Sequence, residues 1–190
     1  MFILYAVVAG LLVGLLLGGR LDSIAETRFR WGWLALVALA IQIILFSPIA
    51  GDGLGEAGRL MYVASTALVV VVVLANARLA GLPIVLAGAM SNLAAIVANG
   101  GSMPASPSAL AALGHTVGDG PTNSTLVARP SLEPLTDIFA TPSWLPFANI
   151  FSVGDVLIGI GLAIAIAASM RTSAPSPARR VRLGDPPDRR

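Results

Sequence analysis

A single carboxylate, Asp155, interrupts the last long apolar stretch of the chain. No arginine or lysine occurs between Arg129 and Arg171, so the sequence offers this carboxylate no nearby cation. An ionisable side chain in such a stretch is costly to bury in lipid, and where it occurs it commonly binds a cation, a proton or a small polar ligand. Asp155 is therefore the first candidate functional residue.

Amide and hydroxyl side chains in other apolar stretches fall at a similar predicted depth. If a helix begins at Phe147, Asp155 lies about 12 Å along it, and Asn92 lies about 10 Å before the end of its own stretch at Asn99. Gln42 and Thr66, on two further stretches, come out about 12 Å and 9 Å from the same predicted surface. Four stretches thus each contribute one polar group to one layer.

The residues around Asp155 and Asn99 extend this layer into a predicted site. Asn149, Ser152 and Asp155 would lie on one face of a helix at about 100° per residue. Glycines beside them would let two helices approach closely. The predicted polar cluster for ligand binding or another function comprises Asn92, Asn99, Gly100, Gly101, Asn149, Ser152, Gly154 and Asp155.

Two interpretations of these polar residues remain open. In lipid, amides and hydroxyls hydrogen-bond between helices and hold a bundle together, and we favour this structural role for single side chains such as Gln42 and Thr66. For Asp155 we favour a functional role. We expect no metal and no other cofactor, since His115 is the only histidine and the chain has no cysteine.

The composition is that of a membrane protein. The chain is 56% hydrophobic and only 12% charged, which is too apolar for a soluble domain of this size. We predict an all-α, polytopic transmembrane helix bundle with about five spans, since a helix of roughly 20 apolar residues crosses a bilayer. The predicted domain covers residues 1–170, with spans at 2–19, 31–50, 60–75, 83–98 and 147–170.

The arginines predict the orientation. Three lie between the first two spans, one between the third and fourth, and six in the tail, whereas the other side has only Arg59 and Arg129. Positive charge accumulates on the cytoplasmic side, so we place the N-terminus outside and the C-terminus in the cytoplasm of a bacterial inner membrane. Residues 171–190, rich in Pro, Ser and Arg, are predicted to form a disordered basic cytoplasmic tail.

Local patterns suggest further structure outside the spans. Ser23 and Glu26 have the spacing of a capping box and predict a short helix before the second span. The outer loop, residues 100–146, contains apolar residues such as Phe139 and Trp144, so we expect it to be partly ordered and to pack against the bundle. A stripe of Gly10, Gly14 and Gly18 is typical of a close helix contact, within the chain or in a homo-oligomer.

Three motifs in order resemble an uncharacterised family of small bacterial polytopic membrane proteins, a domain of unknown function. They are Asn99-Gly-Gly-Ser-Met-Pro104, Leu135-Thr-Asp-Ile138 and Asn149-Ile-Phe-Ser-Val-Gly-Asp155. The resemblance implies a membrane location and a shared site at the outer ends of the last two spans. It implies no activity.

The preferred interpretation is a non-enzymatic subunit or partner of a larger membrane complex, with an outward-facing polar site around Asp155. One alternative is a small-solute or proton-coupled transporter with Asp155 as the titrating group. Another is an intramembrane enzyme, which would need a second group such as Asp137 or His115 beside Asp155. The lipid bilayer is the partner we expect in each case, and no nucleic acid.

Overall fold

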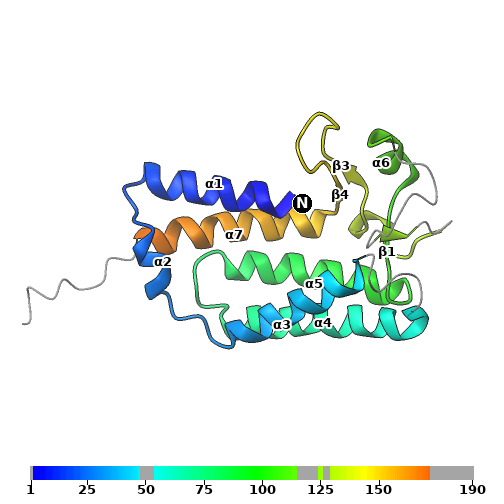
Figure 1. Cartoon of the computed structure of the whole chain (residues 1–190), viewed down its shortest axis with the longest axis horizontal. Helices are drawn as coiled ribbons and strands as arrows, with labels where there is room; N and C mark the ends of the chain where they lie inside the picture. Colours follow the sequence, from blue (N-terminus) through cyan, green and yellow to red (C-terminus); the bar gives the residue numbers. More distant parts are fainter. Residues whose placement is uncertain (1, 48–53, 115–123, 126–128, 172–190) are drawn as a thin grey trace, which may run out of the picture.

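The computed structural model of the chain describes residues 2–47, 54–114, 124–125 and 129–171. The predicted tail beyond Arg171 and the single histidine, His115, lie outside the described residues. The described part is mostly helical (Figure 1). Its longer helices are α1 (Phe2–Leu16), α3 (Gly32–Leu45), α4 (Gly55–Ala75), α5 (Leu82–Ala98) and α7 (Val153–Arg171), and its short ones are α2 (Asp22–Glu26) and α6 (Pro107–Ala112).

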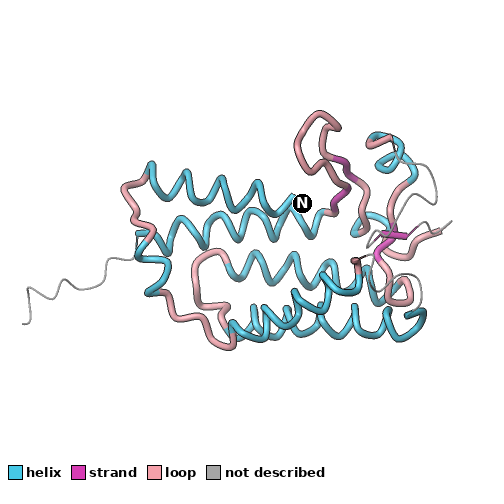
Figure 2. Tube along the Cα trace, viewed as in Figure 1, coloured by secondary structure: helices cyan, strands magenta, loops and turns pink. Residues whose placement is uncertain are grey.

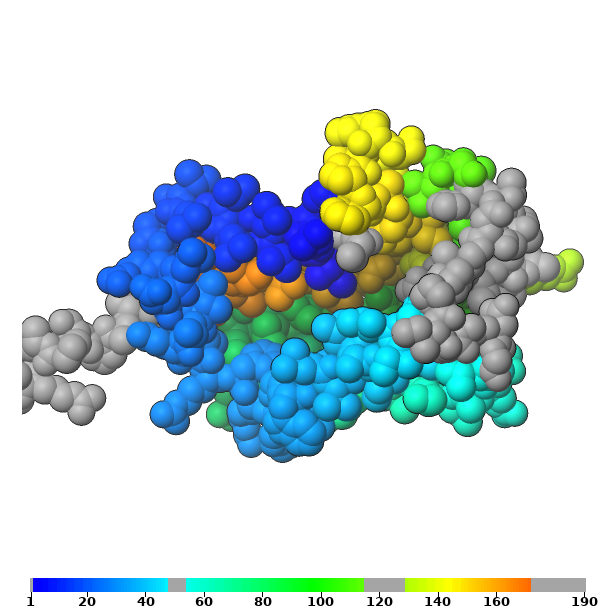
Figure 3. All heavy atoms as spheres, in the orientation of Figure 1, coloured from blue at the N-terminus to red at the C-terminus, as the bar shows by residue number. Residues whose placement is uncertain are grey.

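The longer helices pack in the order α1, α7, α5, α4, α3 (Figures 1 and 2). The last helix of the chain thus lies between the first helix and α5. Figure 3 shows α7 recessed beneath α1, with α5 visible between α1 and α3. The connection between α4 and α5 is tight, because Gly81 takes a positive φ of 81° and Pro83 lies in the first turn of α5.

Glycines set the distance between α1 and α7. A Cβ at Gly10 would lie 2.8 Å from the Cα of Ala163, and one at Gly14 would lie 3.3 Å from the Cα of Ala167, so both glycines are buried against α7. Gly18 faces open space. An oligomer contact through Gly10 and Gly14 would have to displace α7, and that contact remains a prediction.

A second glycine contact joins α5 to α7. A Cβ at Gly161 would lie 2.6 Å from the carbonyl oxygen of Gly81, and one at Gly154 would lie 2.8 Å from that of Gly88. Real side chains do not tolerate such distances from backbone atoms, so these two crossings require glycine. Gly154 and Gly161 therefore allow α7 to pack closely against α5.

Short strands organise the segments between α5 and α7, which include the predicted outer loop and which we call the outer segments. Strand β1 (Met103–Pro104) pairs in parallel with β2 (Ser124–Thr125), and β3 (Phe139–Ala140) pairs antiparallel with β4 (Ile150–Phe151). A 3-10 turn (Glu133–Leu135) precedes the β3–β4 hairpin.

Aromatic contacts attach the β3–β4 hairpin to the bundle. The ring of Phe151 stacks on Phe2 of α1 at 4.5 Å between centroids and on Phe139 at 5.5 Å. The tip of the hairpin differs from the prediction, because Trp144 is 79% exposed and does not pack against the helices.

Two helices, α4 and α7, are long and apolar enough to cross a membrane, whereas α1, α3 and α5 are shorter apolar helices. The helix in the fifth predicted span begins at Val153 rather than Phe147, since residues 150–151 form β4 instead. The predicted short helix before the second span is present as α2, but Leu21 precedes it and no side chain caps it.

Candidate functional site

The first turn of α7 is closed by a capping box. Ser152 directly precedes the helix, and its Oγ accepts a hydrogen bond from the backbone N–H of Asp155 at 3.0 Å. In return, the Oδ2 of Asp155 accepts one from the backbone N–H of Ser152, also at 3.0 Å. Both donors would otherwise lack partners at the start of the helix. The sequence Ser152-Val-Gly-Asp155 therefore has a local structural reason for its carboxylate.

The same carboxylate also links α7 to α5. Asn92 Nδ2 donates to Asp155 Oδ1 at 2.9 Å, and Asn92 Oδ1 accepts from Ser152 Oγ at 2.9 Å. Ser152 is fully buried, and Asp155 is partly buried. The three side chains form one cluster across the α5–α7 contact, as predicted for Asn92, Ser152 and Asp155.

The number of available protons limits which hydrogen bonds the cluster can form at one time. Ser152 Oγ lies 2.9 Å from Asn92 Oδ1 and 3.1 Å from Asp155 Oδ2, but its hydroxyl has one proton and can donate to only one of them at a time. Each Asp155 oxygen nevertheless receives an N–H donor. The carboxylate also lies at the N-terminal, positive end of the α7 dipole.

Two predicted neighbours of Asp155 have other roles. Asn149 precedes α7 and therefore shares no helix face with Asp155, which corrects the prediction. Its backbone exchanges hydrogen bonds with Thr141 across the hairpin, and its Nδ2 donates to the carbonyl of Ile150. Gly154 belongs to the cluster through its backbone, because a Cβ there would lie 2.7 Å from Asn92 Cγ.

The remaining predicted residues hold a different segment. Asn99 Nδ2 donates to the carbonyls of Ala95 and Ser131, and its Oδ1 accepts from the backbone N–H of Ser131. Gly100 and Gly101, which we call the glycine turn, follow it with φ values of 69° and 87°. Asn99 thus ends α5 and fastens the loop at Ser131. The hydrogen bonds divide the predicted site into an Asn92–Ser152–Asp155 cluster and an Asn99 anchor.

The predicted polar layer is likewise divided. Gln42 Nε2 donates to Ser65 Oγ at 3.3 Å and to Thr66 Oγ1 at 3.4 Å, which joins α3 to α4. The structural role favoured for Gln42 and Thr66 agrees with these contacts. The predicted depths of these polar residues did not indicate which helices would pair, namely α3 with α4 and α5 with α7.

The structure also buries two polar residues outside this site, Asn76, which the sequence analysis did not name, and Asp137, which it named as a possible second group beside Asp155. Asn76 is 4% exposed, and its side chain exchanges hydrogen bonds with the backbone N–H and carbonyl of Arg30 at 2.8 Å each. The only indication in the sequence that Asn76 has a structural role is its position directly after an apolar stretch. Asp137 is also 4% exposed, and its backbone bonds to Pro104 and Ser106 organise the outer segments.

The described residues contain no group of three or more histidine, aspartate or glutamate side chains that could hold a metal ion. The side-chain partners of Asp155 are an amide and a hydroxyl, neither of which is a general acid or base near neutral pH. The cluster is therefore suited to holding two helices together and to binding a polar group by hydrogen bonds.

Comparison with known proteins identifies a family without an assigned activity. No curated protein and no solved structure matches the chain. A family model described as a family of unknown function, DUF5317, matches residues 26–167, which include α3 to α5, the outer segments and most of α7. The predicted resemblance to a family of unknown function is thereby confirmed, and the chain belongs to the DUF5317 family of unknown function.

Proposed function

We propose that this protein is a multi-pass protein of the bacterial inner membrane that acts as a non-enzymatic subunit or partner of a larger membrane complex. In this proposal α1, α3, α4, α5 and α7 all lie in the bilayer. The N-terminus and the outer segments face outward. The Asn92–Ser152–Asp155 cluster holds the outward-facing end of the bundle in place for the partner.

Apolar side chains exposed on the surface of the helix bundle support the membrane part of the proposal. Large apolar residues are exposed along the helices, among them Leu16 at 86%, Leu36 at 67% and Ile43 at 61%. A soluble monomer rarely exposes contiguous apolar surface of this extent, whereas lipid chains cover it at no cost. The three shorter helices would be accommodated by local thinning of the bilayer or by flanking residues.

The hydrogen bonds around Asp155 support the proposal that the protein is not an enzyme. Both carboxylate oxygens accept N–H donors from within the chain, one from Asn92 and one from Ser152. A carboxylate held in this way stabilises the α5–α7 contact and the start of α7 without taking part in a reaction. The β3–β4 hairpin joins directly to this helix start, and its exposed Trp144 and Phe147 supply a surface for a partner.

Affinity purification in a mild detergent tests this proposal. We expect the wild-type protein to elute as a stoichiometric complex with another membrane subunit, and the double variant Trp144→Ala/Phe147→Ala to elute alone. Leu16→Ala, at an equally exposed position far from the hairpin, is the matched control and should keep the complex. Elution of the wild-type chain without any partner would refute the proposal.

A transporter is the second candidate, favoured by two buried oxygen atoms that have no hydrogen-bond partner among the residues that the structure describes. They are Ser91 Oγ and Asn149 Oδ1, which lie close in sequence to Asn92 and Ser152. Such atoms could bind water or a polar solute on its way past Asp155. Uptake into proteoliposomes that is abolished by Asp155→Asn, in a protein that stays folded, would favour this candidate over the first.

A further inference from the structure

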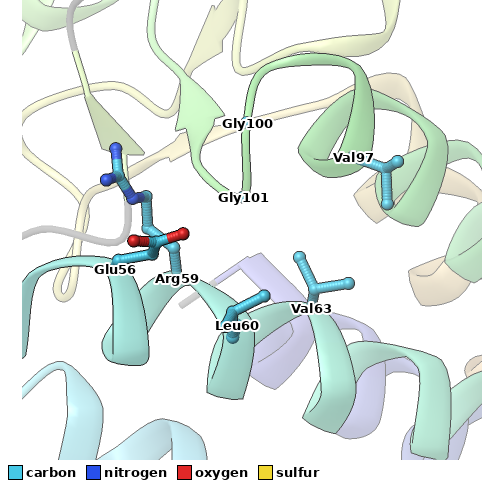
Figure 4. Close-up of a pocket in the computed structure, with 7 residues that line it drawn as sticks. All are labelled: Glu56, Arg59, Leu60, Val63, Val97, Gly100 and Gly101. Carbon is cyan, nitrogen blue, oxygen red and sulfur yellow. The ribbon is translucent and has the colours of Figure 1, made fainter.

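A hollow of about 380 Å³ lies between α4 and α5 at the end of the bundle that carries the outer segments (Figure 4). It is lined from α4 by Glu56, Arg59, Leu60 and Val63, and from α5 by Val97 and the glycine turn. The Asn92–Ser152–Asp155 cluster contributes no residue to it. We call it the α4–α5 hollow.

One side of the hollow carries two opposite charges. Glu56 and Arg59 lie three residues apart on α4, and Figure 4 shows the Arg59 side chain rising from the helix with the Glu56 side chain drawn beside its stem. Within the described part of the chain, neither forms a side-chain hydrogen bond or an ion pair, with each other or with another residue. A guanidinium and a carboxylate without partners can each bind a group of opposite charge.

The other side of the hollow is apolar. Leu60 is 64% exposed and Val97 is 56% exposed. Val63 and Val97 point toward one another across the hollow (Figure 4). A ligand that fills the hollow therefore meets charges near the outer end of α4 and hydrocarbon farther along the helix.

The Asn-Gly-Gly motif shapes the wall between these two sides. A Cβ at Gly101 would lie 2.9 Å from Arg59 Cβ, so only glycine lets the turn lie against α4 at this point. A Cβ at Gly100 would meet nothing within 4 Å. Asn99 fixes the turn by its bonds to Ser131. The motif is thus explained by the hollow rather than by Asp155.

We propose that the α4–α5 hollow binds a zwitterionic phospholipid whose head group carries a phosphate and a primary ammonium, as in phosphatidylethanolamine. Arg59 binds the phosphate through its planar guanidinium, and Glu56 accepts hydrogen bonds from the ammonium. An acyl chain lies along Leu60, Val63 and Val97. This inference rests on the proposed membrane location, which puts Arg59 at the outer lipid–water interface.

Lipid titration of the detergent-purified protein, followed by native mass spectrometry, tests the assignment. The probes are phosphatidylethanolamine, phosphatidylcholine and phosphatidylglycerol with identical acyl chains. We expect the ethanolamine lipid to bind at least about fivefold more tightly than the other two, because choline has no N–H to donate and glycerol has no positive charge.

Two variants separate the contributions of the charges. Arg59→Gln should weaken binding of the ethanolamine lipid at least about tenfold, because the phosphate loses its cation. Glu56→Gln should reduce its affinity to that of the choline lipid. Arg78→Gln, at an arginine in the α4–α5 connection, is the matched control and should leave binding unchanged. Melting temperatures of all three variants should equal that of the wild type.

Three results would overturn the proposal. They are equal binding of the three lipids, equal effects of Arg59→Gln and Arg78→Gln, and binding of soluble phosphoethanolamine as tight as that of the whole lipid, which would leave the apolar wall without a role. Recovery of the protein in the soluble fraction of lysed cells would instead refute the membrane location. Loss of lipid selectivity in a protein that still fractionates with membranes refutes only this inference.

Discussion

The contact between Asn92 and Asp155 predicts that two damaging substitutions rescue each other. Asn92→Asp replaces an amide nitrogen, which lies 2.9 Å from Asp155 Oδ1, with a second carboxylate oxygen. Two like charges about 4 Å apart repel by about 4 kcal/mol at an effective dielectric constant of about 20. Since some of this repulsion is relieved by relaxation, we expect Asn92→Asp to lower the free energy of unfolding by about 3 kcal/mol near neutral pH.

The single change Asp155→Asn should cost less, about 1 kcal/mol. The amide at position 155 can still accept from the backbone N–H of Ser152, and Asn92 can turn its own amide over to accept from the new NH2 group. What is lost is the charge that strengthens the cap at the start of α7.

The double variant Asn92→Asp/Asp155→Asn moves the carboxylate from α7 to α5. Its carboxylate would accept from the new amide and from Ser152 Oγ, so every polar atom of the cluster has a partner again. We expect it to be about 2 kcal/mol more stable than Asn92→Asp alone, although it carries one more substitution.

Reversible unfolding by SDS in mixed micelles measures these free energies. Gln42→Glu is the control, since it introduces a carboxylate into the separate Gln42–Ser65–Thr66 contact of α3 and α4. Asp155→Asn should not rescue that variant. If the effects of Asn92→Asp and Asp155→Asn simply add within about 0.5 kcal/mol, the two side chains do not interact and the cluster described here is refuted.

The other predictions concern packing, capping and topology. Gly154→Ala should lower the free energy of unfolding by about 1 to 3 kcal/mol, because its Cβ would lie 2.8 Å from a backbone carbonyl oxygen of α5, and an unchanged unfolding curve would contradict that close approach. Asn76→Ala should cost about 2 kcal/mol in the same assay, since it removes both bonds to Arg30, whereas a cost below about 0.5 kcal/mol would show that these bonds do not hold α3 to α4. A reporter fused after Arg190 should report the cytoplasm and one inserted at Gly118 the outside, and the same side for both would exclude a five-span topology.

Hydrophobic stretches and turn residues were sufficient to predict most of the helices. Helices α3 and α5 lie close to the spans predicted at 31–50 and 83–98, and α2 lies before the second of the predicted spans, as expected. The start of α7 was misjudged because hydropathy does not distinguish an apolar strand from an apolar helix. Ile150 and Phe151 are apolar enough to continue the span, but they pair with Ala140 and Phe139 of the hairpin instead.

The capping boxes show the same limit at a single site. Both Ser23-x-x-Glu26 and Ser152-x-x-Asp155 have the required spacing, but only the second forms reciprocal bonds. The pattern at Ser152 was therefore visible, and it would have placed the helix start correctly. Depth in an apolar stretch is a misleading measure for Asp155, because this residue lies in the first turn of α7.

Partner choice between helices depends on shape that a single sequence does not display. The order α1, α7, α5 places the last helix between two earlier ones, so α7 needs small residues on two faces. Gly154 and Gly161 face α5, and Gly159 faces Phe2 and Ala6 of α1.

With its glycines used for these contacts, α7 keeps few polar atoms for anything else. Its one carboxylate lies in the first turn, where the helix needs an acceptor and where Asn92 of α5 comes within reach. Asp155 thus caps the start of α7 and fixes the position of α7 along α5. Because the β3–β4 hairpin directly precedes this helix start, the same contact also positions the hairpin. A change at this point should therefore reach the partner surface of the hairpin through the position of α7, even though Trp144 is not part of the Asn92–Ser152–Asp155 cluster.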